Sequence, residues 1–201
     1  MDGGPKLTNN VYSFRERKRF SAGERRERDI QVIEEMLDGC IAVRIGDEEE
    51  DRKGIDYVIT LHGGAQVYVD AKARDKGCSR HWRNGPELAL EDYSVVPENG
   101  HSARMGWTFD ESKLTDLVLF TFDLSDTELC YLLPFQLLRV AAKRNWLEWS
   151  QRYKNDEQDS GLWKSHCVFV PASAIMNAIM EVSILGACST EPLQLALWGS
   201  T

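Results

Sequence analysis

Long apolar runs are missing from this sequence. The opening segment MDGGPKLTNN has no apolar stretch, and the most apolar later stretch, residues 174–188, is interrupted by Asn177 and Glu181. A secretory leader needs an apolar core of about 7–15 residues, and a membrane-spanning helix needs about 20. The sequence therefore predicts neither a signal peptide nor a membrane span.

Paired cysteines are missing as well. The five cysteines are odd in number and scattered, and no C-x-x-C pair occurs. This pattern favours free thiols in a reducing compartment over a disulfide framework, so we expect a cytoplasmic protein. A zinc site built on Cys78, His81 and His101 would need a fourth closed ligand, which is not evident. The sequence also contains no internal repeat, no low-complexity run and no P-loop.

Charge is present but unevenly distributed. The net charge of −8 argues against a protein that is coated with nucleic acid. Acidic residues gather at 47–51, however, and basic residues crowd 15–28 and 74–83. Residues 1–20 predict a flexible basic arm that either solubilises the chain or contacts phosphate. Residues 21–201 fit a single domain of ordinary size.

The stretch GIDYVITLHGGAQVYVDAK, residues 54–72, is predicted to form a β-hairpin. Its two runs rich in Val, Ile, Tyr and Thr, 57–61 and 66–71, flank a turn whose glycines tolerate positive φ. Because side chains alternate between the faces of a strand, Asp70 and Lys72 share one surface. These residues alone leave two interpretations open: a catalytic constellation, or a solvated strand face with a local ion pair.

The hairpin resembles the signature of the PD-(D/E)XK nuclease superfamily. In this chain the signature is Gly54-Ile55-Asp56 followed by Val69-Asp70-Ala71-Lys72, and it departs from the family pattern in having isoleucine at the proline position. The resemblance implies a restriction-endonuclease-like α/β fold, with a mixed central sheet flanked by helices. It implies that Asp56 and Asp70 bind Mg²⁺, with Mn²⁺ as a substitute. Lys72 would then steady the attacking water or the charge that develops on the phosphate.

A second, more diffuse similarity is to phage-type members of the same superfamily. It rests on an acidic strand that contains Glu91, on Gly106-Trp107, and on the segment SKLTD at 112–116. The family often places a Glu on the helix before the core strands, where Glu34 lies at the edge of the apolar stripe. Glu34 is therefore a candidate metal ligand, and whether Glu34 or Glu91 completes the site stays open.

Periodicity and turn signals predict the remaining elements. The predicted helices are 21–37 (starting at Ser21 or Glu24), 135–143 with a continuation over 145–154, and one that starts at Pro171. The predicted strands are 40–45, 87–96, 117–122, 128–133 and 165–170. The acidic run 47–51 and the segment 155–161 are predicted loops. The apolar tail 193–198 must pack on its own domain or on a second subunit, so a homodimer is one expected assembly.

The first function hypothesis is a Mg²⁺-dependent endonuclease that hydrolyses phosphodiester bonds of DNA. Basic residues after the hairpin are predicted to contact DNA phosphates. They are Arg74, Lys76, Arg80 and Arg83. The alternative is a catalytically silent protein of phage or mobile-element origin that uses the same fold to hold nucleic acid or a protein partner. The sequence leaves open whether DNA or RNA is bound, and which structure or bases are preferred.

Overall fold

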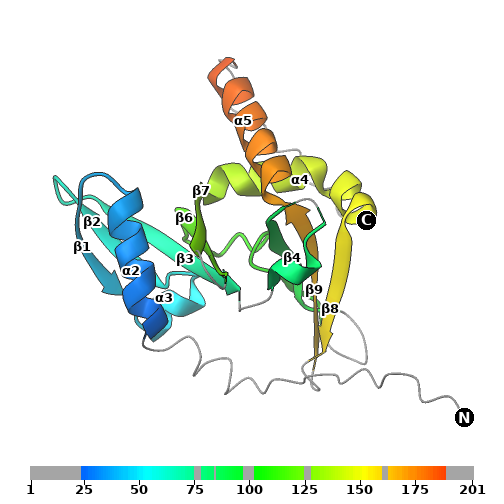
Figure 1. Ribbon diagram of the computed structural model, residues 1–201, viewed down its shortest axis with the longest axis horizontal. Helices are drawn as coiled ribbons and strands as arrows, with labels where there is room; N and C mark the ends of the chain where they lie inside the picture. The colour runs from blue at the N-terminus through cyan, green and yellow to red at the C-terminus, as the bar shows by residue number, and fades with distance from the viewer. Residues whose placement is uncertain are drawn as a thin grey trace, which may run out of the picture.

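The computed structural model describes residues 24–74, 78–83, 85–96, 102–124, 128–159 and 163–188. Within these ranges the chain forms an α/β protein with a mixed five-stranded sheet, a four-stranded antiparallel sheet and four α-helices (Figure 1). The helices are α2 (Glu24–Met36), α3 (Glu48–Arg52), α4 (Phe135–Arg152) and α5 (Ala172–Cys188), with a short 3-10 helix, η1 (Cys78–His81). The predicted α/β class and mixed sheet are confirmed.

The mixed sheet has the strand order β1-β2-β3-β6-β7. Its strands are β1 (Cys40–Ile45), β2 (Tyr57–Leu61), β3 (Gln66–Arg74), β6 (Leu117–Asp123) and β7 (Glu128–Pro134). Strand β3 pairs antiparallel with β2 and parallel with β6, and the other neighbours are antiparallel. Gly63 and Gly64 take φ values of 93° and 83° in the β2–β3 turn. The predicted hairpin is therefore confirmed, and its second strand lies at the centre of the sheet.

The second sheet has the order β5-β4-β9-β8, and all of its pairs are antiparallel. Its strands are β4 (Glu87–Val95), β5 (Arg104–Met105), β8 (Lys154–Asp159) and β9 (Lys164–Pro171). Leu88 pairs with Val170 and Leu90 with Val168, and all four side chains are fully buried. This sheet therefore contributes an apolar surface to the core.

One face of the mixed sheet, here called the inner face, packs towards the second sheet and helices α4 and α5. Three residues of β6 belong to the buried cluster that these elements share: Val118, Phe120 and Phe122. The parallel register places them beside Asp70, Lys72 and Arg74 of β3. Neighbouring residues in register point to the same side of a sheet. Three charged side chains of the central strand therefore lie on the inner face.

Helix α2 covers the opposite, outer face of the mixed sheet. Its Ile33 is fully buried against Tyr57, Ile59 and Val69. The hydroxyl of Tyr57 also donates a 2.9 Å hydrogen bond to the buried carboxylate of Asp29 on the same helix. The amphipathic helix predicted near the N-terminus is confirmed, and it leaves the inner face free for the site.

Two segments that were predicted as loops are regular structure. The acidic run forms α3, where the Asp47 side chain accepts the N–H groups of Glu49 and Glu50 and the Glu50 side chain accepts the N–H of Asp47. This capping box satisfies the free N–H groups at the helix start. The second correction is β8, a polar strand that pairs along its length with β9. The predicted arm, 1–20, and the apolar tail, 193–198, lie outside the described residues.

Helix α5 extends away from the two sheets (Figure 1). The side predicted to be buried carries Ile175, Ile179 and Val182, which are all buried. Met180 and Ile184 lie on the exposed side of the same helix. No helix within the described ranges is both long and apolar enough to cross a membrane.

Candidate active site

Asp56 and Asp70 come together on the inner face. The β2–β3 register pairs Tyr57 with Val69, so one further step along the ladder places Asp56 opposite Asp70. Directly opposed residues of antiparallel strands have Cβ atoms about 4.5–5.5 Å apart. Only 3% of Asp70 is exposed, and Asp56 is partly buried. Two carboxylates therefore face each other at a site that is only partly open to solvent.

Backbone hydrogen bonds hold Asp56 in this position. Its Oδ2 accepts a 2.7 Å hydrogen bond from the N–H of Ala71. Its own N–H donates to the carbonyl of Val69 at 2.8 Å, and its carbonyl accepts the N–H of Gly46 at 2.7 Å. The orientation of the Asp56 carboxylate is thus determined by the strand that carries Asp70.

The loop before β6 fastens the segment that leads into Asp56. Thr115 is buried, and its hydroxyl donates a 2.6 Å hydrogen bond to the carbonyl of Gly54. Gly54 has a φ of +79°, and a Cβ there would come within 2.9 Å of the side chains of Lys113 and Thr115. A larger residue is therefore excluded both by conformation and by space. Asp116 also connects this loop to β3, because its carboxylate accepts a 2.9 Å hydrogen bond from the N–H of Tyr68.

Lys72 lies beside Asp70 on the same face. Its Nζ is 2.5 Å from Oδ1 of Asp70 and 5.2 Å from the centroid of the Trp107 ring. The Lys72 side chain is 31% exposed, whereas that of Asp70 is 5% exposed. The ammonium group is therefore held by a buried partner, while part of the Lys72 side chain remains exposed.

The close approach of these groups changes their protonation. Burial and the neighbouring Asp70 carboxylate raise the pKa of Asp56 to about 6, although Lys72 and the N–H of Ala71 act in the opposite direction. Burial alone would lower the pKa of Lys72, but the charges of Asp70 and Asp56 outweigh it and raise this pKa. The site therefore places the ammonium of Lys72 beside two aspartates. A divalent cation would relieve the excess negative charge.

Glu91 of β4 is a further carboxylate near Lys72. Burial raises the pKa of Glu91, while the N–H of Trp107 and the charge of Lys72 act against this effect. The Glu91 Oε2 accepts a 3.2 Å hydrogen bond from the N–H of Trp107. Gly106 permits this approach, because a Cβ at that position would overlap the Glu91 carbonyl group. The sequence indicates Gly106-Trp107 as a motif, but it does not indicate that the motif packs on Glu91.

Other predicted site residues lie apart from this cluster. Glu34 is exposed on α2, the helix of the outer face, and is not brought next to the two aspartates. Arg80 and Arg83 are exposed in and after η1, and Lys76 lies outside the described residues. Arg74, predicted in a loop, is instead on the inner face, because β3 continues as far as this residue.

The donor set fits a hydrated cation better than a closed metal site. No group of three or more His, Cys, Asp or Glu side chains in the described part of the chain is arranged to hold a metal ion. Mg²⁺ is usually bound through one or two carboxylates and keeps several waters or substrate oxygens. The opposed pair of Asp56 and Asp70 meets that requirement for Mg²⁺ or Mn²⁺.

No protein-family model, no curated protein and no solved structure matches this chain. The strongest functional feature is the group of Asp56, Asp70 and Lys72 at the centre of the mixed sheet.

Proposed function

We propose that this protein is a metal-dependent endonuclease that hydrolyses phosphodiester bonds of DNA. The observation that carries the proposal is the opposition of Asp56 and Asp70 across β2 and β3, with the ammonium of Lys72 2.5 Å from Asp70. Negative charge builds on the phosphate during hydrolysis, and a cation with an adjacent ammonium would stabilise it. The same three residues carry the resemblance to the PD-(D/E)XK superfamily. A mixed sheet flanked by helices is compatible with its restriction-endonuclease-like fold.

In this proposal Asp56 and Asp70 hold Mg²⁺ or Mn²⁺. When bound, the cation lowers the pKa of a coordinated water and neutralises charge on the phosphate. Two carboxylates leave room for the water and phosphate oxygens that the reaction needs. Glu91 is better placed than Glu34 to assist them, because it lies near Lys72 whereas Glu34 is on the outer face.

Lys72 provides positive charge at the point of reaction. Asp70 and Asp56 keep its ammonium protonated, and the contact with Asp70 orients it. The ammonium donates hydrogen bonds to the attacking water or to a phosphate oxygen. This interaction is stronger once charge has developed than in the bound substrate, so Lys72 should contribute to rate rather than to affinity.

The test is a single-turnover cleavage assay on supercoiled and linear DNA with Mg²⁺ or Mn²⁺, run beside a binding assay in Ca²⁺. Lys72→Ala should slow cleavage about a hundredfold or more, on the order of 3 kcal/mol, with little change in DNA binding. The matched control is Lys53→Ala, because Lys53 also pairs with a carboxylate, Glu49, at 2.6 Å but on the surface. That variant should cleave like the wild type.

Two outcomes would argue against the proposal. Wild-type cleavage rates in Lys72→Ala would show that Lys72 does not stabilise the transition state. If the wild type binds DNA but cleaves no substrate with either metal, the catalytically silent binding protein becomes the better description.

A further inference from the structure

A pocket of about 200 Å³ lies next to the proposed active site and takes no part in the chemistry above. It is called here the Arg74 pocket. Arg74 follows Lys72 by two residues, so both side chains lie on the inner face of β3. Arg74 is four positions further along the strand than Asp70, a distance on the order of 13 Å. A nucleic-acid strand bound at the aspartates can therefore reach the pocket within a few nucleotides.

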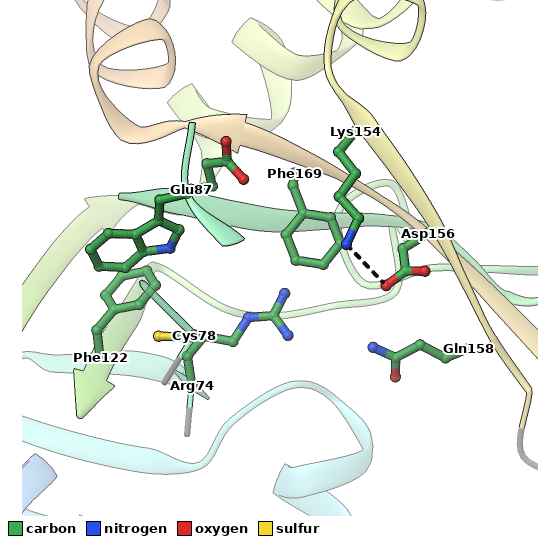
Figure 2. A pocket seen from close by; sticks show the side chains of 9 residues that line it. Arg74, Cys78, Glu87, Phe122, Lys154, Asp156, Gln158 and Phe169 are labelled. Carbon is green, nitrogen blue, oxygen red and sulfur yellow. Dashed lines mark ion pairs between the residues drawn. The ribbon is translucent and has the colours of Figure 1, made fainter. Parts of the chain in front are cut away.

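Aromatic rings form much of the pocket wall. The Trp82 and Phe122 rings make an edge-to-face contact with their centroids 5.3 Å apart. Two cations lie over the ring of Phe169 on β9. The Arg74 guanidinium is 4.7 Å from the ring centroid, and the Lys154 ammonium is 5.0 Å from it. Figure 2 shows Phe122 on one side of the pocket, Arg74 and Phe169 in the middle, and the residues of β8 on the other side.

Arg74 has an unused hydrogen-bond donor in this pocket. Its Nη2 atom is buried and has no hydrogen-bond partner within the described part of the chain. Buried polar atoms nearly always have a partner, and a guanidinium nitrogen can only donate. The missing partner is therefore an acceptor, and a ligand can provide it.

The charges around the pocket balance, which argues against a bare phosphate as the ligand. Two cations, Arg74 and Lys154, are opposed by two carboxylates, Asp156 and Glu87. Lys154 is already 3.8 Å from Asp156, and Glu87 accepts the N–H of Arg83 at 3.2 Å. A doubly charged anion would be attracted by one pair and repelled by the other. A neutral ring with both donors and acceptors on its edge suits the lining better.

We propose that the Arg74 pocket receives one unstacked nucleobase of the bound DNA. Its volume is below the roughly 300–1,000 Å³ of pockets for drug-sized ligands, which suits a single planar ring system. Aromatic walls stack bases that have left the helix. Guanine is the best match, because arginine donates to its O6 and N7 atoms and the Asp156 carboxylate can accept from its N–H groups. The inference rests on the proposed function and assigns it a substrate class, DNA with an unpaired base.

The experiment compares three fluorescent DNA duplexes by anisotropy in Ca²⁺, without cleavage. One has a single bulged guanine, one has an abasic residue at the bulge, and one is fully paired. Base stacking on aromatic side chains predicts that the wild type binds the guanine bulge about 5- to 150-fold more tightly than the abasic bulge. Equal affinity for these two duplexes would overturn the proposal.

Variants test whether the preference for the guanine bulge over the abasic bulge arises in the Arg74 pocket. Arg74→Ala should lower the ratio of guanine to abasic affinity, because it removes the donor to the base, and Arg74→Lys should lower it as well while keeping the charge. Asp156→Asn, at a partly buried position of a surface strand, should also reduce the ratio of guanine to abasic affinity, because it removes a carboxylate that can accept from the base. Arg152→Ala is the control, because Arg152 is exposed at the end of α4 and pairs with Glu148. An unchanged ratio in Arg74→Ala and Asp156→Asn would place the base elsewhere and overturn the proposal.

The design separates the failure of the pocket from the failure of the nuclease. A guanine preference that depends on Arg74, combined with no cleavage in Mg²⁺ or Mn²⁺, would support the pocket and contradict the endonuclease. Cleavage that requires Lys72, combined with equal binding of guanine and abasic bulges, would support the endonuclease and contradict the pocket.

Discussion

The hydroxyl of Thr115 donates a 2.6 Å hydrogen bond to the carbonyl of Gly54, two residues before Asp56. The two residues are 61 positions apart in the chain, and both are buried. The bond connects the loop before β6 to the entrance of β2. It therefore links the position of Asp56 to β3 and β6, the two parallel strands of the mixed sheet.

Thr115→Val should destabilise the fold and disturb the site. Valine keeps the shape of threonine but leaves the buried Gly54 carbonyl without its donor, which costs about 1–3 kcal/mol. Thr115→Ser retains the hydroxyl and should lose less. Urea denaturation of the three proteins measures the difference, and Thr115→Val with wild-type stability would mean that this bond does not hold the Asp56 segment.

Asp56→Asn should stabilise the metal-free protein at neutral pH. The folded protein binds a proton at Asp56 with a pKa of about 6, above the ordinary value of 3.8. The favourable contribution of protonated Asp56 is therefore complete below about pH 4 and is lost as the pH rises through about 6. The difference between the pKa of about 6 and the ordinary value corresponds to at most about 3 kcal/mol, and solvent screening lowers this to about 1–2 kcal/mol.

Denaturation in EDTA at pH 4 and pH 7.5 checks this expectation. The Asn variant should match the wild type at pH 4 and exceed it at pH 7.5. The opposite order at pH 7.5 would show that Asp56 is stabilised in its charged form. Adding Mn²⁺ should then stabilise the wild type and have little effect on the variant.

Divalent cations should bind at the two opposed aspartates. Mn²⁺ titration followed by electron paramagnetic resonance should give an affinity that falls tenfold or more in Asp70→Asn, because one of two charged ligands is removed. Glu34→Gln should bind Mn²⁺ like the wild type, since Glu34 is exposed on the outer face. A loss of affinity in Glu34→Gln with no loss in Asp70→Asn would place the metal elsewhere.

Arg80 and Arg83 should contribute affinity for DNA rather than chemistry. Both are exposed, and their neighbours Cys78 and Trp82 pack against the core cluster of the inner face. Arginine contacts to phosphate release counterions. The double substitution to Ala should reduce the slope of log affinity against log salt by about 1.4–1.8, the value for two phosphate contacts. The control replaces Arg144 and Arg152, which are also exposed but lie on α4. An unchanged slope in the first double variant would mean that the DNA runs along another surface.

Much of the site core follows from local sequence. Runs of β-branched residues on either side of a glycine turn specify the hairpin, and the two-residue period of a strand places Asp70 and Lys72 on one face. The register of the same short hairpin brings Asp56 opposite Asp70. The sequence also carries a local signal for helix α3, because Asp47 and Glu50 have the spacing of a capping box.

Tertiary structure decided everything that depends on how the second sheet packs. Lys154–Asp159 is polar and has little intrinsic preference for a strand, yet it forms β8 because β9 offers a row of backbone partners. Glu91 approaches Lys72, and Arg74 stacks on Phe169, only because β4 and β9 lie across from the inner face. Strand periodicity assigns a side chain to a face but does not say what that face meets. That contact arises between segments far apart in the chain, through burial of the apolar core that both sheets share.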